Sequence, residues 1–385
     1  MKKNICIITG SRAEYGLLKP IIALVDEDKE LELRLVVTGM HLSYEFGLTY
    51  KEIEKDGFII DEKIESVVSS DTSSGVSKSM GLTMIGFADY FARKKTDLVI
   101  VLGDRYEILA ATCSALIANI PVAHIHGGET TEGSLDEAFR HSITKMSYLH
   151  FVSNEEYRKR VIQLGEDPIR VFNVGALGVE NIMKMNLLNK SELEESIGFK
   201  LNKRYALVTF HPATLEKNKL ELQLKEMLTA LDSFKDIKII FTKSNSDKDG
   251  RIINSLIDNY VEYNKERAIA FNSMGQLRYL SAMKYSSFVL GNSSSGIIEA
   301  PSFKIPTVNI GDRQKGRIQA DSIINCDPNS KEITDAINKA LNQSEEKLKL
   351  IINPYGQGNT SEKIVNRIKE INLDKISLKK SFYDL

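Results

Sequence analysis

The chain has 385 residues, with 51 Lys or Arg and 52 Asp or Glu, so its formal net charge at pH 7 is -1. Without an excess of positive charge, neither nucleic acid nor an anionic membrane surface is expected as the main partner. The length favours two domains, and no stretch approaches the roughly 18 apolar residues of a membrane span. The N-terminus is too poor in apolar residues for a signal peptide, and three scattered cysteines in no metal-ligand spacing predict a soluble cytoplasmic protein with reduced thiols.

The first part of the chain alternates short apolar runs with segments of helical spacing. Strands are predicted at 4–9, 31–38, 97–102, 121–125 and 149–153, and helices at 15–26, 77–95, 106–118, 135–147 and 155–164. Strands that alternate with helices of about 10 to 15 residues are typical of βαβ units and a parallel sheet.

The same pattern restarts after a domain boundary that we expect near 174–203, within which 189–200 is charged and polar. Here strands are predicted at 205–210, 237–241, 288–290 and 307–310, and helices at 220–234, 277–283 and 360–371. We therefore predict an α/β protein made of two Rossmann-like domains with parallel sheets that face each other across a cleft. The predicted domains are residues 1–175 and 176–360, with a C-terminal helix and tail, 361–385, that packs back on the first domain.

Polar clusters stand where the predicted strands end. In an open parallel sheet, ligands bind beyond the carboxyl ends of the strands. Each cluster alone could be an ordinary loop, but several at equivalent places favour a binding site. They are Gly10-Ser11-Arg12, Gly39-Met40-His41, Gly103-Asp104-Arg105, His126 to Glu129, His211-Pro212 and Gly291 to Gly296.

The segment 291–299 reads as the end of a strand, a polar turn and the start of a helix. The hydroxyls of Ser293 and Ser294, and first-turn N–H groups such as that of Gly296, would suit a phosphate at the positive end of the helix dipole. Glu299, about one turn further, could accept hydrogen bonds from a diol such as ribose. The alternative is that these serines only cap the helix.

Two arginines at strand ends are candidate phosphate partners. Arg12 follows the first strand and Arg313 follows the strand at 307–310, although either could instead form a surface salt bridge. The loop around Arg12, TGSRAEYG, lacks both the G-x-G-x-x-G fingerprint and the P-loop lysine, so NAD and ATP are poorly supported.

The densest group of ionisable residues lies at 124–141, and Asp104 follows a neighbouring strand. No known metal-ligand spacing occurs there, and carboxylates and imidazoles in a cleft fit general acid–base chemistry better than metal binding. Asp136 and Arg140 are one helical turn apart and could pair on a helix surface. His150 is expected to be a core histidine, whereas His41 and His211 stay open. The group comprises His124, His126, Glu129, Glu132, Asp136, Glu137, Arg140 and His141.

A phosphate and diol site on one domain, opposite acid–base groups on the other, suggests a nucleotide-diphosphate sugar whose anomeric bond is broken. At this point the chain resembles a family, the hydrolysing UDP-N-acetylglucosamine 2-epimerases of sialic acid biosynthesis. The resemblance runs in order from about residue 3 to residue 318. It rests on the motifs GSRAEYG, VTGMH, LGDRYE, HIHGGE, DEAFRHSITKMS, FHP, GNSSSGIIE and NIGDRQKGR.

The resemblance implies a GT-B fold, UDP held mainly by the second domain, and no metal or redox cofactor. It implies release of UDP and N-acetylmannosamine by anti elimination to a 2-acetamidoglucal and addition of water. It also suggests a homodimer through the first domain. Close relatives in legionaminic acid pathways use UDP-2,4-diacetamido-2,4,6-trideoxyglucose, and the sequence does not separate the two substrates. A non-hydrolysing epimerase, a retaining glycosyltransferase and a sensor that binds UDP without turnover are the other hypotheses.

Carried over by position, the resemblance makes Asp104, Glu129, Asp136 and His211 the acid–base and sugar-contacting residues. Many relatives have HIEGGE where this chain has HIHGGE, so an imidazole, His126, replaces a carboxylate often treated as the C2 base. Whether His126, Asp104 or Asp136 takes the C2 proton stays open. The diphosphate and ribose would be held by Arg12, Ser293, Ser294, Gly296 and Glu299, with Arg313 close to the phosphates.

Overall fold

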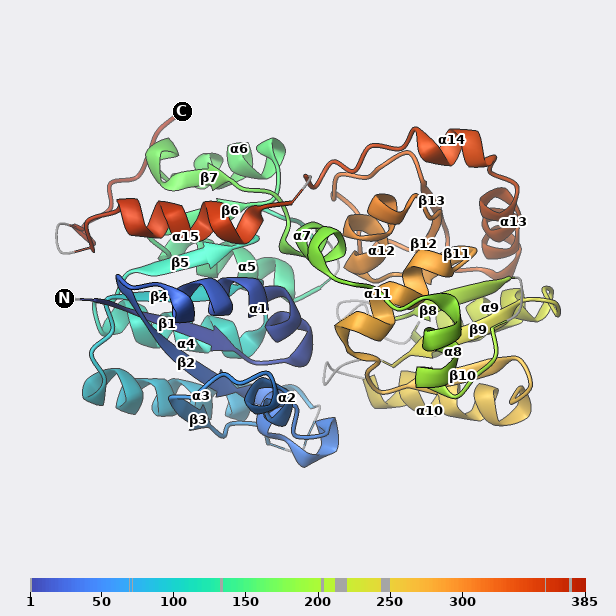
Figure 1. Cartoon of the computed structure of the whole chain (residues 1–385), viewed down its shortest axis with the longest axis horizontal. Coiled ribbons are helices and arrows are strands. Elements are labelled where there is room, and N and C mark those ends of the chain that lie inside the picture. Colours follow the sequence, from blue (N-terminus) through green and yellow to red (C-terminus); the bar gives the residue numbers. More distant parts are fainter. Residues whose placement is uncertain are drawn as a thin grey trace. The chain divides into compact units, whose positions relative to one another are not determined.

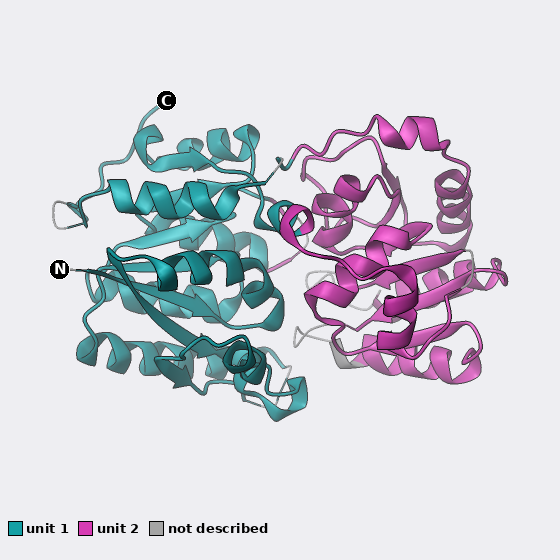
Figure 2. Ribbon diagram, viewed as in Figure 1, with its two compact units in different colours: residues 1–129, 136–181, 355–385 teal, residues 130–135, 182–354 magenta. Residues whose placement is uncertain are grey.

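The computed structural model describes residues 2–68, 70, 72–131, 134–201, 204–211, 220–243, 250–356, 358–373 and 376–385. The chain forms two compact units (Figure 2). Unit 1 comprises Met1–Glu129, Asp136–Asn181 and Tyr355–Leu385, and unit 2 comprises Thr130–Leu135 and Ile182–Pro354. The main division between the units thus lies after Asn181, whereas the domain division expected from the sequence lies after residue 175. The chain returns to unit 1 at Tyr355.

Unit 1 is built on a sheet in which every pair of neighbouring strands is parallel. The strand order is β3-β2-β1-β4-β5-β6-β7, so the order reverses between β1 and β4. Ligands bind at such a switch point in open α/β sheets, beyond the carboxyl ends of the strands. The strands are β1 (Lys3–Thr9), β2 (Leu31–Thr38), β3 (Glu62–Ile64), β4 (Leu98–Leu102), β5 (Val122–Ile125), β6 (Leu149–Val152) and β7 (Val171–Asn173).

Helices cover both faces of this sheet (Figure 1). Because side chains alternate across a strand, Ile5 and Ile7 join a core with α1 and α15, whereas Cys6 and Ile8 join a second core with α3 and α4. The C-terminal helix α15 packs against α1. The helices are α1 (Arg12–Glu27), α2 (Tyr50–Lys55), α3 (Ser73–Arg93), α4 (Tyr106–Ile117), α5 (Asp136–Met146), α6 (Glu155–Gln163), α7 (Leu177–Lys184, which continues into unit 2), α15 (Thr360–Glu370) and the 3-10 turns η1 (Gly39–Leu42), η2 (Tyr44–Phe46) and η3 (Pro168–Arg170).

Unit 2 repeats the architecture with the strand order β10-β9-β8-β11-β12-β13, again parallel and with the reversal between β8 and β11. Its strands are β8 (Tyr205–Thr209), β9 (Lys238–Thr242), β10 (Ala268–Phe271), β11 (Phe288–Gly291), β12 (Thr307–Ile310) and β13 (Ile323–Cys326). Its helices are α8 (Lys190–Ile197), α9 (Leu220–Asp232), α10 (Gly250–Tyr263), α11 (Gly275–Tyr285), α12 (Ser294–Ile298), α13 (Ser330–Leu341), α14 (Glu345–Lys349) and the 3-10 turn η4 (Ala300–Phe303).

The prediction of two α/β domains with parallel sheets is confirmed. The boundary expected near 174–203 contains the division after Asn181, and its charged stretch at 189–200 is mostly helix α8. That helix begins with a capping box between Asn189 and Glu192 and ends at Gly198, whose φ is 64°. The N-x-x-E pattern of this capping box is visible in the sequence itself. Within the described ranges, no helix has both the length and the apolar character needed to cross a membrane.

Candidate active site

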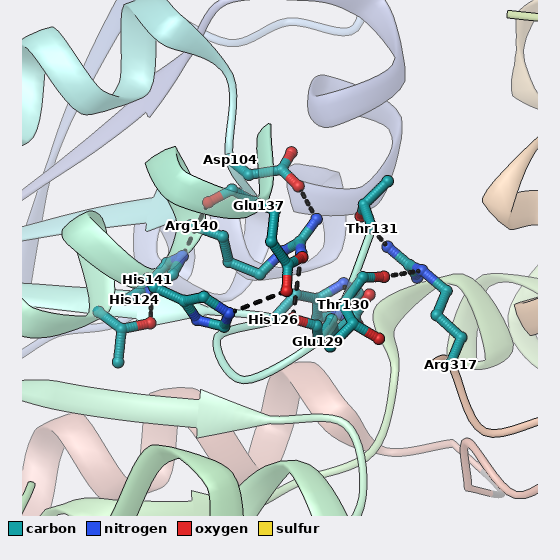
Figure 3. A network of polar contacts seen from close by, with 12 residues as sticks. Asp104, His124, His126, Glu129, Thr130, Thr131, Glu137, Arg140, His141 and Arg317 are labelled. Carbon is teal, nitrogen blue, oxygen red and sulfur yellow. Dashed lines mark hydrogen bonds and ion pairs between the residues drawn. The ribbon is translucent and has the colours of Figure 1, made fainter. Parts of the chain in front are cut away.

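Arg140 is the centre of a polar network at the carboxyl edge of the first sheet (Figure 3). Its guanidinium forms ion pairs with Asp104, which follows β4, and with Glu137 at 2.9 Å. It also donates to the main-chain carbonyl of Glu129 at 3.0 Å. Because the guanidinium is planar and carries five donors, it fixes three chain segments relative to one another. Arg140 is only 1% exposed, so the helix-surface position considered as an alternative for it does not hold.

The face of α5 explains how one helix supplies much of this network. Glu137, Arg140 and Thr144 are spaced three and four residues apart, so their side chains share one face. His141 contributes an Nε2 contact of 3.1 Å to the Glu137 carboxylate. The helical spacing of Glu137, Arg140 and Thr144 could be read from the sequence. That this face of α5 turns toward the interior of the unit could not.

His124, fully buried on β5, links two of these segments through its ring. Its Nε2 lies 2.7 Å from the carbonyl oxygen of Gly103, and its Nδ1 lies 3.0 Å from the Thr144 hydroxyl. Burial lowers the pKa of His124 to about 3. The ring is thus neutral, with its proton on the Nε2 that faces the carbonyl, and it holds the loop that carries Asp104 beside α5.

His126 and Glu129 form a second contact just after β5. The His126 Nδ1 is 3.5 Å from Glu129 Oε1, and the Leu177 N–H donates to His126 Nε2 at 3.4 Å. Glu129 is 3% exposed and its Oε1 also accepts from the Ser153 hydroxyl at 3.2 Å. His126 has φ of 66°, a left-handed conformation that is uncommon for a residue with a side chain.

The chain that follows Glu129 is held by an arginine of unit 2. Arg317 Nε donates to the carbonyl of Thr130 at 2.8 Å, and its NH2 group contacts the Thr131 hydroxyl at 3.3 Å (Figure 3). Both threonines belong to unit 2, whereas Asp136, which opens α5, belongs to unit 1 and is partly exposed. Glu132, named as a candidate from the sequence, lies outside the described residues.

At the end of β1, Ser11 caps α1 in a capping box with Glu14. Arg12 forms an ion pair with Glu52 at 2.7 Å, so the salt bridge expected as one alternative exists in this structure. This contact joins Arg12, the first residue of α1, to Glu52 on α2.

Two carboxyl groups are buried behind this loop. Glu14 accepts the N–H groups of Gly10 at 2.7 Å and Ser11 at 3.1 Å. Burial, and then the nearby carboxylate of Glu107, raise the pKa of Glu14 to about 8. Glu107 is fully buried and pairs with Arg105 Nε at 3.0 Å. A Cβ at Gly10 would lie 2.6 Å from Glu107 Cγ, so the loop needs glycine there.

In unit 2, Asn292 joins the ends of neighbouring strands. Its side chain accepts the His211 N–H at 2.7 Å and donates to the His211 carbonyl at 2.8 Å. Its own carbonyl accepts from Arg313 at 3.1 Å and from Gln314 at 2.8 Å. Gly291 before it has φ of 131°, and any Cβ there would collide with the Thr209 carbonyl oxygen.

The serines that follow have separate roles. Ser293 caps α12, because its hydroxyl accepts the Ser295 N–H at 3.4 Å, which is the alternative considered for these serines. Ser295 bonds to the Tyr279 hydroxyl at 2.8 Å, and Ser294 is partly exposed in the first turn. Gly296 is required by packing, since a Cβ there would lie 2.8 Å from Thr307 Cγ2.

Glu299 stands at the end of α12 rather than one turn into a longer helix, because the helix has only five residues. Burial raises the pKa of the Glu299 carboxyl. Burial and then the charge of Glu299 raise the pKa of Tyr279 to about 12. These two groups therefore lie close together beside the serine turn.

The structure thus groups the predicted residues by unit. Unit 1 holds Arg12, Asp104, His126, Glu129 and Asp136, and unit 2 holds His211, Ser293, Ser294, Gly296, Glu299 and Arg313. Sequence reasoning missed the linking roles of Arg140, Asn292 and Arg317. Among the described residues, no group of three His, Cys, Asp or Glu side chains is placed to bind a metal ion.

A family model described as UDP-N-acetylglucosamine 2-epimerase matches residues 23–369. This chain belongs to that family. The similarity extends over the whole length of several relatives of the same family, and the prediction of the family and of a hydrolysing epimerase is confirmed.

Three relatives cover nearly all of the chain. A Campylobacter jejuni protein named GDP/UDP-N,N'-diacetylbacillosamine 2-epimerase (hydrolyzing) is 45% identical, with 100% of both chains covered. Polysialic acid biosynthesis protein P7 of Escherichia coli is 42% identical over 100% of this chain and 98% of its own. A Legionella pneumophila protein named UDP-N,N'-diacetylbacillosamine 2-epimerase (hydrolyzing) is 35% identical over 97% of each.

The fold of the epimerase family also matches a solved structure. The Methanocaldococcus jannaschii UDP-GlcNAc 2-epimerase in complex with UDP-GlcNAc and UDP superposes with a TM-score of 0.81, covering 95% of this chain and 99% of that one at 23% identity. The predicted GT-B type of fold is therefore confirmed.

Proposed function

We propose that this epimerase acts on UDP-N,N'-diacetylbacillosamine, which is UDP-2,4-diacetamido-2,4,6-trideoxyglucose, and releases UDP and the free sugar epimerised at C2. The observation that carries the proposed chemistry is the network around Arg140, which holds acidic residues at the carboxyl edge of the first sheet. Two full-length relatives, at 45% and 35% identity, have this sugar in their names, which supports the choice of substrate.

A second candidate is UDP-N-acetylglucosamine, with N-acetylmannosamine as the product, in sialic acid biosynthesis. The E. coli relative named polysialic acid biosynthesis protein P7 is 42% identical over the whole chain and favours this alternative. The two substrates differ at C4 and C6 of the sugar, so the residues near those carbons would distinguish them.

The reaction needs two coordinated events on the sugar. The C2 proton is not acidic, and it becomes removable as the C1–O bond to UDP breaks and positive charge builds at C1. Loss of that proton and of UDP, from opposite faces, gives a 2-acetamidoglucal. Water then adds its hydroxyl to C1 and a proton to C2 on the face opposite to the first proton. The products are UDP and the inverted free sugar.

The acid–base and sugar-contacting residues in this proposal are Asp104, Glu129, Asp136 and His211, and His126 lies beside Glu129. Asp104 is fixed by its ion pair with the buried Arg140, and Glu129 by the contact of its carbonyl with the same guanidinium. Fixed carboxylates suit proton transfer, because a base must be within hydrogen-bond reach of the proton that it removes.

The UDP group in this proposal is held by Arg12, Ser293, Ser294, Gly296, Glu299 and Arg313. Arg313 is anchored beside the serine turn through its 3.1 Å bond to the Asn292 carbonyl. Arginine and hydroxyl donors stabilise the charge that develops on a departing diphosphate. The proposal includes no metal or redox cofactor.

Incubation with each UDP-sugar in deuterated water, followed by NMR, tests the function. We expect free sugar with deuterium at C2, with a higher kcat/KM for the diacetamido sugar than for UDP-N-acetylglucosamine. The GDP-linked sugar is a matched control for the nucleotide. Intact nucleotide sugar epimerised at C2 would indicate a non-hydrolysing enzyme, and tight UDP binding without turnover of any UDP-sugar would indicate a sensor.

We also propose a cytoplasmic homodimer that associates through unit 1. Helices α3 and α4 pack side by side and expose apolar residues on the outer surface of the unit. Ile85 on α3 is 62% exposed and Ile117 on α4 is 74% exposed. Light scattering should give a dimer for the unmodified protein and a monomer for Ile117→Asp, whereas a monomer in both cases would refute this interface.

A further inference from the structure

We infer that His126 is a positioning residue that orients the Glu129 carboxylate, and that it does not take the C2 proton. The inference rests on the proposed function.

The two ring nitrogens of His126 face groups of the protein itself. Nε2 accepts the N–H of Leu177, the first residue of α7, at 3.4 Å. Nδ1 faces Glu129 Oε1 at 3.5 Å. A histidine that removes a proton from the sugar would have to turn a nitrogen lone pair toward C2, but here the Nε2 lone pair is directed at a main-chain amide.

These contacts determine the tautomer of the ring. A main-chain N–H can only donate, so Nε2 must accept and the proton of the neutral imidazole lies on Nδ1. The Nδ1 that carries this proton lies 3.5 Å from Glu129 Oε1. The contact of Nε2 with Leu177 thus orients the ring so that Nδ1 faces the carboxylate of Glu129.

The main chain supports the same orientation. His126 has φ of 66° and its N–H donates to the Phe151 carbonyl at 2.9 Å. A left-handed conformation at a residue with a side chain costs about 1 to 3 kcal/mol and persists only where the surroundings impose it. Here it directs the ring into unit 1, where the residue is buried.

Glu129 receives support from two further directions. Its Oε1 accepts the Ser153 hydroxyl at 3.2 Å, and its carbonyl accepts from Arg140 at 3.0 Å. Several groups of unit 1 therefore hold Glu129 in place, and His126 is one of them. Removal of the C2 proton then falls to Asp104 or Asp136, the other two carboxylates of the proposed acid–base set.

Four substitutions of His126 separate the two roles. Asparagine places an amide N–H where Nδ1 stands and tolerates positive φ, so it restores the donor to Glu129 without being a base. Glutamine reaches the Nε2 position and restores only the contact with Leu177. Glutamate supplies a base, but its charge would face that of Glu129. Alanine removes every ring contact.

The measurements are kcat, KM and deuterium incorporation at C2, with melting temperatures to confirm folding. We expect His126→Asn to keep kcat within about 10-fold of the unmodified enzyme, and His126→Ala, His126→Gln and His126→Glu to lose about 100-fold or more. An active His126→Glu together with a His126→Asn as slow as His126→Ala would overturn the inference. Failure of the unmodified enzyme to turn over any UDP-sugar would instead refute the proposed function.

A readout independent of turnover is the tautomer of the ring. In the ¹⁵N-histidine NMR spectrum, the signals lost in His126→Asn identify this ring among the six histidines. We expect the proton on Nδ1 at neutral pH, and a ring protonated on Nε2 alone would overturn the inference even in a catalytically active enzyme.

Discussion

The carboxyl edges of the two sheets have the same topology but opposite chemistry. In unit 1 the groups that link neighbouring loops are charged and buried, with Arg140 at 1% exposure and Glu129 at 3%. In unit 2 the link is Asn292, whose neutral side-chain amide bonds to the main-chain N–H and carbonyl of His211. The main-chain carbonyl of Asn292 accepts hydrogen bonds from two side chains. The residues of the loops, and not the fold that the two units share, thus set the chemistry of each edge.

The difference matters because buried charges are stable only when they are paired. A network of paired charges fixes carboxylates in a set geometry, which favours proton transfer. A neutral scaffold that presents hydroxyls, main-chain N–H groups and an arginine favours an anionic leaving group. In the proposed reaction, most acid–base groups therefore lie in unit 1 and most UDP-binding groups in unit 2, with His211 and Arg12 as the exceptions.

The largest expected effect separates these two roles. Asp136→Asn removes a proposed acid–base group, so kcat should fall by about 1,000-fold while the Kd for UDP stays nearly unchanged. Ser294→Ala, in the other unit, is the matched variant and should weaken UDP binding with the fold intact. Calorimetric titration of UDP and steady-state kinetics measure both. A large loss of UDP affinity in Asp136→Asn would contradict the division of roles.

The second expected effect concerns the stability of the charged edge. Arg140→Met leaves the carboxylate of Asp104 without its buried partner, so the free energy of unfolding should fall by about 3 to 5 kcal/mol. Arg204→Met is the control, because Arg204 is 55% exposed and lies 3.9 Å from Asp236. Denaturant titration of both variants gives the values. An equal, small effect in both would mean that the Arg140 network contributes little.

The third effect is a pH dependence that comes from Glu14. Its pKa is raised from 4.5 to about 8 in the folded chain. At pH values between 4.5 and 8, the folded chain keeps a proton on Glu14 that the unfolded chain has released. The contribution of Glu14 to stability is therefore complete below about pH 4.5 and declines as the pH rises toward 8. The loss is at most a few kcal/mol, since one pKa unit corresponds to about 1.36 kcal/mol.

Glu14→Gln tests this dependence, because the amide keeps an oxygen acceptor for the N–H groups of Gly10 and Ser11 but cannot ionise. Melting temperatures between pH 5 and 8 should decline less in Glu14→Gln than in the unmodified protein. Glu262→Gln, at a side chain 68% exposed, should leave the decline unchanged. Parallel curves for all three proteins would contradict the role of Glu14.

The smallest effect is expected at the neutral edge. Asn292→Ala loses two hydrogen bonds to the main chain of His211, so stability should fall by about 1 to 3 kcal/mol and UDP binding should weaken. Asn292→Asp keeps the oxygen that accepts the His211 N–H and should be less destabilising. If Asn292→Ala abolished folding, the neutral edge would be as critical as the charged one.

Much of the secondary structure was predictable because apolar periodicity is a local property. The strands at 31–38 and 307–310 have the bounds that the sequence predicted. The short strands β3 and β7, at the ends of the first sheet, were missed because three residues carry no periodic signal. The strands β10 and β13 lie at the ends of the second sheet and were missed as well.

The candidate site was predictable in a different way. Glycine and polar residues at strand ends marked Asp104, Glu129 and the serine turn, because parallel strands bring their carboxyl ends to one edge. The inward turn of Arg140 and the amide bridge of Asn292 were not predictable, since both depend on which distant loop each side chain meets.

The sequence by itself determined most of the strands and helices, the two α/β units and the family, because these follow from local patterns and from motifs in a fixed order. Only the tertiary structure decided that Arg140 is buried and that both nitrogens of His126 face the protein. These facts depend on contacts between residues far apart in the chain, such as His126 with Leu177. Local spacing identifies the groups that carry the chemistry, and packing decides which way each one points.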